Sequence, residues 1–394
     1  MKEALVSAVK CPDYEESSVK EAFDKLLGPL GGLSFVKPGM TVAIKVNLVS
    51  AMKPHRAATT HPALVSELCR RIVEAGATPV VGDSPGGPFT GIYLNGVYSA
   101  TGMNAVEKAG GRLNRDFDVD MCTFPEGEVM KEFSCSSWLL RADCVINFAK
   151  LKTHGMMGMS AAVKNLFGAI PGIIKPEYHY RFPNSRDFAS MLVDIDEFIA
   201  PALSIVDGVV GMEGNGPTMG KARPIGVLAA SASPYALDLY CAGVIGLSEG
   251  NVPTLQVAAE RGLAPDGITV AGDAADVKIS DYENVERSNN IEFVLGLSGF
   301  KGKFINKFTR AALSTRPKLK GSECVGCRKC EGICPAKAIT MKRSRPHIDR
   351  NVCIRCFCCQ EFCPKGALKV YRPVIARIMT KSGAKKKKRA DDNK

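Results

Sequence analysis

Two cysteine-rich stretches, CVGCRKCEGICP at residues 324–335 and CIRCFCCQEFCP at residues 353–364, decide the fold of the carboxyl-terminal part of this chain. Each stretch has the spacing Cys-x2-Cys-x2-Cys-x3-Cys-Pro. Three thiolates two residues apart can surround three corners of an iron–sulfur cubane, and a fourth thiolate beyond a bend can reach a second cubane. The repeated spacing therefore predicts two [4Fe–4S] clusters.

The same rule assigns the ligands of each cluster. One cluster takes Cys324, Cys327, Cys330 and Cys363, and the other takes Cys353, Cys356, Cys359 and Cys334. Structural zinc is the alternative, but zinc sites usually leave a long gap between two pairs of ligands. The additional Cys358 is either a substitute ligand or a packed or reactive thiol. From about residue 320 to 371 the chain resembles bacterial two-[4Fe–4S] ferredoxins, which implies a small α+β module.

Charge and cysteine content divide the 394-residue chain near residue 300. Residues 301–394 hold 26 Lys and Arg against 6 Asp and Glu, whereas residues 1–300 hold 26 against 34. We predict an α/β domain over residues 1–300, a basic linker over 301–320, the cluster module over 321–372 and a basic, disordered tail over 373–394. Fifteen cysteines without an export signal or a long apolar run predict a soluble, cytoplasmic protein with no transmembrane segment.

Residues 1–300 alternate apolar, β-branched runs with stretches of helical periodicity. This alternation predicts an α/β fold, with a mostly parallel sheet and helices on both faces. We predict strands at residues 4–9, 41–48, 79–82, 144–148, 203–206, 225–229 and 268–271. We predict helices at residues 61–75, 159–167, 188–199 and 234–247, the last with Ser233 as its N-cap.

Polar residues follow several of these predicted strands, where open α/β sheets bind their ligands. We therefore expect a cationic pocket for a carboxylate or phosphate substrate, although each residue taken singly is also compatible with a structural or solvated role. Neither a dinucleotide fingerprint nor a Walker sequence is present. The pocket candidates are Lys45, Asn47, Asp83, Ser84, Gly86, Lys150, Lys152, His154, Asn165, Glu213 and Asn215, and the catalytic candidates are Lys152, His154, His61 and Lys164.

Six short motifs carry a resemblance that spans about residues 5–300. They are K-x-N at 45–47, THP at 60–62, GDSPG at 82–86, KLKTH at 150–154, KNLFG at 164–168 and EGNGP at 213–217. They resemble the "domain of unknown function 362" family, whose members often carry a ferredoxin-like module. The resemblance implies a redox protein of anaerobic bacterial or archaeal metabolism and supplies no agreed substrate.

These patterns leave three functions to be distinguished. In the first, an iron–sulfur oxidoreductase passes single electrons between its clusters and a site in the α/β domain or a partner redox enzyme. In the second, the chain is a non-catalytic electron carrier whose α/β domain is a docking module. Basic residues near the clusters would raise the reduction potential, bind an acidic partner or simply be solvated. In the third, the lysine-rich tail anchors the chain to nucleic acid or a membrane, but one short run without aromatic residues gives nucleic-acid binding little support.

Overall fold

The computed structural model describes residues 3–285 and 316–371 of the chain. Two compact units are present, residues 1–284 and residues 285–394, which we call the α/β domain and the cysteine module. The predicted boundary at residue 300, residues 301–315 of the predicted linker and the predicted tail all lie outside the described residues.

A nine-stranded sheet forms the centre of the α/β domain, in the order β11-β1-β10-β9-β7-β2-β3-β4, with β8 paired to β7. The strands are β1 (Glu3–Lys10), β2 (Thr41–Val46), β3 (Thr78–Gly82), β4 (Arg112–Leu113), β7 (Cys144–His154), β8 (Gly158–Ser160), β9 (Leu203–Glu213), β10 (Lys221–Ser231) and β11 (Gly267–Ala271). β10 is antiparallel to both of its neighbours and β8 is antiparallel to β7, whereas the other pairs are parallel. The predicted mostly parallel sheet is confirmed.

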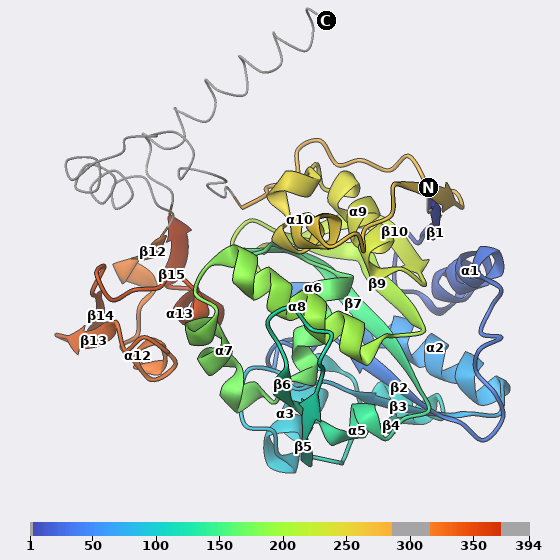
Figure 1. The fold of residues 1–394 in the computed structure, drawn as a ribbon, viewed down its shortest axis with the longest axis horizontal. Helices are drawn as coiled ribbons and strands as arrows, with labels where there is room; N and C mark the ends of the chain where they lie inside the picture. Colours follow the sequence, from blue (N-terminus) through green and yellow to red (C-terminus); the bar gives the residue numbers. More distant parts are fainter. Residues whose placement is uncertain (1–2, 286–315, 372–394) are drawn as a thin grey trace, which may run out of the picture. The chain divides into compact units, whose positions relative to one another are not determined.

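Helices cover both faces of this sheet, as predicted (Figure 1). α1 contacts α2, and α2 contacts α4, whereas α6, α8, α9 and α10 form a second contacting group. Neighbouring residues of β1 show the two faces, because Ala8 shares a hydrophobic cluster with Leu237 of α9 and Val9 shares another with Phe23 of α1. The helices are α1 (Glu16–Leu27), α2 (Pro62–Glu74), α3 (Gly91–Thr101), α4 (Ala105–Lys108), α5 (Ser137–Leu140), α6 (Ala162–Asn165), α7 (Lys175–Arg181), α8 (Ser185–Ile199), α9 (Pro234–Val244) and α10 (Pro253–Glu260).

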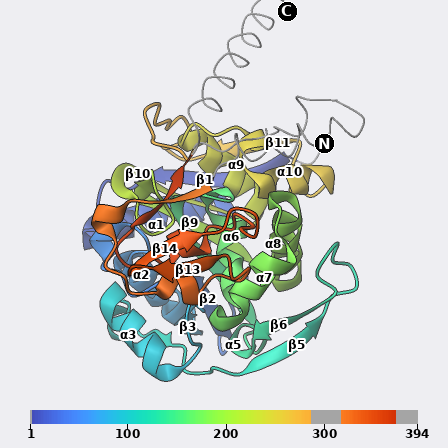
Figure 2. The same ribbon diagram turned by 90° about the vertical axis from the view of Figure 1, so that its left-hand side faces the viewer.

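Short elements complete the domain. The strands β5 (Val119–Thr123) and β6 (Glu132–Ser136) form a separate hairpin, which Figure 2 shows beside α5. Single 3₁₀ turns are η1 (Gly28–Leu30), η2 (Pro54–Arg56), η3 (Leu166–Ala169), η4 (Gly172–Ile174) and η5 (Glu249–Asn251). The predicted N-cap of α9 is confirmed, since the Ser233 hydroxyl accepts a hydrogen bond from the backbone N–H of Ala236 at 3.2 Å.

Three sequence predictions for this domain are wrong. Residues 150–154 belong to strand β7 and do not follow it, because β9 and β8 both continue to pair with this part of the chain. Similarly, β9 extends to Glu213, well beyond the end of the predicted strand over residues 203–206. The predicted helix over 159–167 is replaced by β8, the four-residue helix α6 and the 3₁₀ turn η3, because Gly158 turns the chain back onto β7.

The cysteine module consists of two equivalent halves, each built around one of the cysteine runs. Its elements are β12 (Arg316–Leu319), η6 (Gly321–Glu323), α12 (Lys329–Gly332), β13 (Ile339–Lys342), β14 (Arg345–Ile348), α13 (Cys358–Glu361) and β15 (Leu368–Tyr371). β12 pairs with β15 and β13 with β14, both antiparallel. Residues 316–319, which the sequence assigns to the linker, therefore belong to this module as the counterpart of β14.

Candidate functional site

The first predicted set of four cysteines lines a single cavity in the cysteine module. Cys324, Cys327 and Cys330 come from the first run, and Cys363 comes from the second. The wall of this cavity is completed by apolar residues and by three basic residues, Arg328, Lys329 and Lys365. The crossed arrangement predicted from the spacing thus corresponds to a physical juxtaposition of these four side chains.

The thiols of the second set also lie near one another. Burial raises the pKa of the Cys353 thiol, and the neighbouring Cys356 and Cys334 raise it further. The pKa of Cys330 in the first set is raised by burial and then by Cys363 and Cys327. The pKa of each of these two thiols is thus raised by other members of its own predicted set. Thiolates gathered in this way repel one another unless a cation or a metal cluster neutralises them.

The backbone around the cysteines has the same conformation in both halves. Arg328 and Phe357, which occupy equivalent positions in the two runs, both have a φ of 62°, in the left-handed region that bulky residues rarely adopt. Their torsions turn the chain between the second and third cysteines of each run. At the ends of the runs, the N–H groups of Ala338 and Ala367 donate to the sulfurs of Cys334 and Cys363, each at 3.2 Å. Each half therefore presents a cysteine sulfur that already accepts a hydrogen bond from a backbone amide, as the sulfurs of cluster ligands commonly do.

These residues fit an iron–sulfur cubane better than a single metal ion. Zinc would require four sulfurs about 2.3 Å from one centre. Within residues 3–285 and 316–371, no three His, Cys, Asp or Glu side chains converge closely enough to hold one ion. Four cysteines instead surround a cavity, so a larger cofactor with ligands at its corners suits the first set.

Cys358 occupies the position that Lys329 has in the first half, at the start of α13. It is 1 % exposed, and its thiol is hydrogen-bonded to the sulfur of Cys356. This bond and burial raise the pKa of Cys358 well above its usual value. A protonated, packed thiol next to a ligand position fits the role of a hydrogen-bond donor to that ligand better than the role of a substitute ligand.

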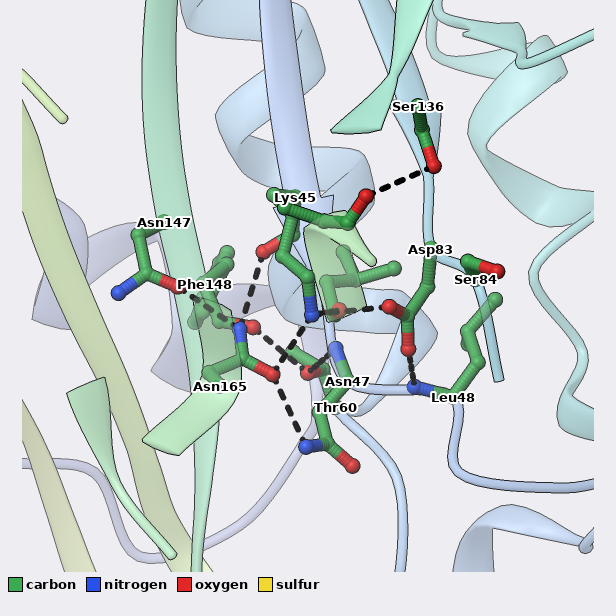
Figure 3. A network of polar contacts seen from close by, with 12 residues as sticks. Lys45, Asn47, Leu48, Thr60, Asp83, Ser84, Ser136, Asn147, Phe148 and Asn165 are labelled. Atoms are coloured by element: carbon green, nitrogen blue, oxygen red, sulfur yellow. Dashed lines mark hydrogen bonds and ion pairs between the residues drawn. The ribbon is translucent and has the colours of Figure 1, made fainter. Parts of the chain in front are cut away.

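In the α/β domain, the structure brings several of the predicted pocket residues into one buried network (Figure 3). Lys45 of β2 forms an ion pair with Asp83 at 2.9 Å, and both side chains are buried. The Lys45 ammonium also donates to the side-chain oxygen of Asn165 at 3.0 Å. Asn165 in turn donates to Asn147 at 2.8 Å and accepts from Asn47 at 2.9 Å. This side-chain amide uses its donors and acceptor within the network, which holds it in one orientation.

A second buried ion pair lies between β7 and β9. The parallel register places Lys150 opposite Asp207, and their charged groups are 2.7 Å apart. The Tyr14 hydroxyl donates to Asp207 at 3.0 Å and accepts from the Lys150 ammonium at 2.9 Å. Because each lysine pairs with a buried carboxylate, both pairs satisfy the requirement that buried charges be compensated.

His61 lies at the margin of this second pair. Its ring stacks on Tyr14 with centroids 3.6 Å apart, and its backbone N–H donates to Asp207 at 3.0 Å. Its Nδ1 atom accepts from the backbone N–H of Ala63, which makes His61 the N-cap of α2. Burial lowers the pKa of the imidazole to about 4, so the ring is neutral near pH 7.

The remaining predicted residues are distributed around the two pairs. Lys152 donates to the side chain of Asn47 at 2.9 Å and to the carbonyl of Ala58 at 2.7 Å, which links it to the first pair through Asn47. The Ser84 hydroxyl accepts a hydrogen bond from the backbone N–H of Gly172, and the backbone N–H of Gly86 donates to the carbonyl of Val49. The His154 ring accepts hydrogen bonds from the backbone N–H groups of Met156 and Met157, and the Lys164 ammonium lies over the ring of Phe167. The Glu213 carboxylate accepts a hydrogen bond from the backbone N–H of Glu283, and Asn215 follows β9.

Sequence reasoning missed Tyr14, Asp207 and Asn147 as members of the network. A lysine within a buried strand requires a carboxylate on a neighbouring strand, and this requirement is the signal that could have identified Asp207.

Sequence reasoning also missed the start of the cysteine module. The repeated sequences RPKL at 316–319 and RPHI at 345–348 are separated by the same interval as the two cysteine runs.

The fold and the cysteine cavity together define an iron–sulfur protein that joins an α/β domain to a dicluster module. Comparison with known families agrees: residues 316–364 match the 4Fe-4S dicluster domain, and residues 42–243 match the family described as "Domain of unknown function (DUF362)". The chain belongs to this DUF362 family. The predicted family and the predicted type of module are both confirmed.

One curated relative is the thylakoid-associated protein sll1697 of Synechocystis sp., which is 38% identical over 267 residues, covering 66% of this chain and 80% of the relative. Two solved structures are more distant. The lactate racemase apoprotein of Thermoanaerobacterium thermosaccharolyticum has 15% identity and a TM-score of 0.39, over 60% of this chain and 56% of that one. A protein from Thermotoga maritima has 13% identity and a TM-score of 0.36, over 57% and 56%. The chain thus spans little more than half the length of either structure.

Crossing a bilayer requires a long helix that is apolar along its whole length. Over residues 3–285 and 316–371, no helix combines that length with that apolar character.

Proposed function

We propose that the protein transfers single electrons through two [4Fe–4S] clusters, to or from a site in the α/β domain or a partner redox enzyme. The observation that carries this proposal is the cavity shared by Cys324, Cys327, Cys330 and Cys363. A ligand set drawn from both runs, with three thiolates from one and the last from the other, is the pattern of two-cluster ferredoxins.

The eight cysteines of the two sets would hold the clusters, which supply one-electron chemistry when bound. The chain's own contribution is to position the thiolates and to set their surroundings. The N–H groups of Ala338 and Ala367, aimed at Cys334 and Cys363, would stabilise negative charge on those sulfurs. Hydrogen bonds of this kind are among the factors that set a cluster's reduction potential.

The candidate reaction site of the α/β domain is the polar network around the two lysine–aspartate pairs. Asn47, His61 and Tyr14 are its partly exposed members, whereas Lys45, Lys150 and Lys152 are buried. An anionic small molecule at this margin would meet a histidine that is neutral at pH 7. We propose His61, Lys152, His154 and Lys164 as the residues to test first for an oxidoreductase reaction.

The second candidate function is a non-catalytic electron carrier whose α/β domain docks on a partner. Its support is the pairing of Lys45 with Asp83 and of Lys150 with Asp207, because lysines that are already neutralised suit a structural role. For the compartment we propose the cytoplasm. All fifteen cysteines lie in the described residues and none forms a disulfide, as a reducing environment would maintain them, whereas the name of the Synechocystis relative places that relative at thylakoids.

Anaerobic reduction with dithionite separates these functions. The reduced protein should lose part of its visible absorbance and gain an EPR signal that returns to baseline when a suitable electron acceptor is added. Reoxidation by a small acid or thio-compound that is lost in His61→Gln would support the oxidoreductase. Reoxidation only by partner proteins, unchanged in His61→Gln, would support the carrier. A protein that dithionite cannot reduce would contradict both.

A further inference from the structure

The two halves of the cysteine module place their basic residues differently around the cluster positions. Three basic residues line the cavity of the first set: Arg328, Lys329 and Lys365. The residues at the equivalent positions of the other half are Phe357, Cys358 and Ala336. None of these counterparts is charged. The basic residues near the second set, Arg355 and Lys337, instead take the places that Gly326 and Gly366 have near the first set. The repeat therefore makes the ligands equivalent but places the basic residues differently around them.

The basic residues of the first half are also available to a partner. Lys329 and Lys365 are exposed, and neither forms an ion pair with any of the described residues. Arg328 is exposed too, but it pairs with Glu331 at 2.9 Å. Unpaired exposed lysines keep their full charge for an incoming molecule, whereas a paired arginine presents a weaker field.

The cavity wall is itself accessible between these lysines. Cys327 is exposed, and the neighbouring Val325 is 62 % exposed although it is apolar. Electron transfer requires close approach to the cluster, so the exposed ligand residue Cys327, whose counterpart Cys356 is buried, suits the exchange of electrons with a partner.

We propose that the protein exchanges electrons with an acidic redox protein, which docks at the first cluster position on the basic rim formed by Lys329, Lys365 and Arg328. This inference rests on the proposed electron-transfer function and deepens it by naming the cluster and the charge of the partner. Complementary charge steers diffusional encounter and increases association rates by about 10- to 1,000-fold, an effect that salt suppresses.

Two single-electron acceptors of opposite charge test the docking site. One is an acidic blue-copper protein, whose Cu²⁺ becomes Cu⁺, and the other is basic cytochrome c, whose Fe³⁺ becomes Fe²⁺. In both reactions one electron leaves the reduced full-length protein and no proton or ligand is exchanged. The rate is followed by anaerobic stopped-flow absorbance at low and at high ionic strength.

The test variant is the double charge reversal Lys329→Glu/Lys365→Glu, and the matched control is Lys342→Glu/Arg350→Glu. Both control residues are exposed in the same module but do not line the cavity. At low salt we expect the test variant to reduce the blue-copper protein about tenfold more slowly or worse, and cytochrome c no more slowly than before. The control variant should stay within about twofold of the unmodified protein.

Iron content and the EPR spectrum of each variant must match those of the unmodified protein, so that altered rates report docking and not cluster loss. Equal slowing in the test and control variants would assign the effect to net charge and overturn the docking site. An unchanged blue-copper rate in the test variant would overturn it as well. A protein that holds no iron would instead contradict the underlying electron-transfer function, so the two failures are distinguishable.

Discussion

The α/β domain and the cysteine module handle crowded ionisable groups in opposite ways. In the α/β domain, buried Lys45 and Lys150 each pair with a carboxylate supplied by the same fold. In the module, clustered thiols such as Cys330 and Cys359 have neighbouring thiols as their electrostatic partners, and these add to the rise in pKa that burial causes. One unit therefore contains its own counter-charges, whereas the other needs an external cofactor to hold its ligands together.

Removing iron should produce the largest difference between the two units. Anaerobic treatment with a chelator should abolish hydrogen-exchange protection across β12 to β15, because metal binding and folding are coupled in small metal-holding modules. Protection of β2, β7 and β9 in the α/β domain should persist. Loss of protection in both units together would show that the α/β domain also depends on the clusters.

Breaking a buried ion pair should give the next largest effect. Asp207→Ala leaves Lys150 buried without its carboxylate and should lower the free energy of unfolding of the α/β domain by about 3–5 kcal/mol. The matched control is Asp281→Ala, which removes the exposed partner of Arg223 and should cost less than about 1 kcal/mol. Urea unfolding followed by circular dichroism measures both. Similar losses for the two variants would mean that the buried network does not stabilise the domain.

These contrasts also explain how much the sequence could predict. The cysteine spacing determines which thiols can reach one cluster, so the ligand sets follow from local sequence. The carboxylate partner of Lys150 is Asp207, far along the chain, and only the register of β7 with β9 brings the two together. From the sequence alone, residues 150–154 are therefore expected to follow the strand over 144–148, although burial and pairing make them the end of β7.

The start of the module was misplaced for a different reason. The composition of residues 301–320 is basic throughout, and this hid the strand Arg316–Leu319 within an apparent linker. Its pairing with β15 depends on a stretch that comes much later in the chain, after both cysteine runs. Comparing the two halves for repeated non-cysteine residues would have identified it, because Arg316 and Pro317 recur as Arg345 and Pro346.

A smaller effect is expected when the pH is lowered. The pKa of His61 is about 4 in the folded protein and about 6.5 when unfolded, so the folded state prefers the neutral ring. The contribution of His61 to the free energy of unfolding is complete above about pH 6.5 and is lost as the pH falls from 6.5 towards 4. Because this ring is partly exposed, we expect the loss of unfolding free energy to be about 1–2 kcal/mol. Buried His179, whose pKa is lowered to about 3, lowers the unfolding free energy at acidic pH in the same direction. His61→Gln should flatten the unfolding free energy measured between about pH 4 and 6.5; an unchanged slope would contradict the burial of His61.

The smallest effect should come from Cys358→Ser. If Cys358 only donates a hydrogen bond to Cys356, serine can replace it and iron content should remain within about a tenth of that of the unmodified protein. Cys356→Ser, by contrast, should remove iron from one cluster position. Iron quantitation and EPR compare the two, and equal iron loss would make Cys358 a ligand.

Iron and acid-labile sulfide in anaerobically purified protein test the central claim most directly. Two cubanes held by the eight cysteines predict about eight iron atoms and eight sulfides per chain, in a brown protein. A colourless protein that contains zinc bound by sulfur, with neither iron nor labile sulfide, would contradict the account.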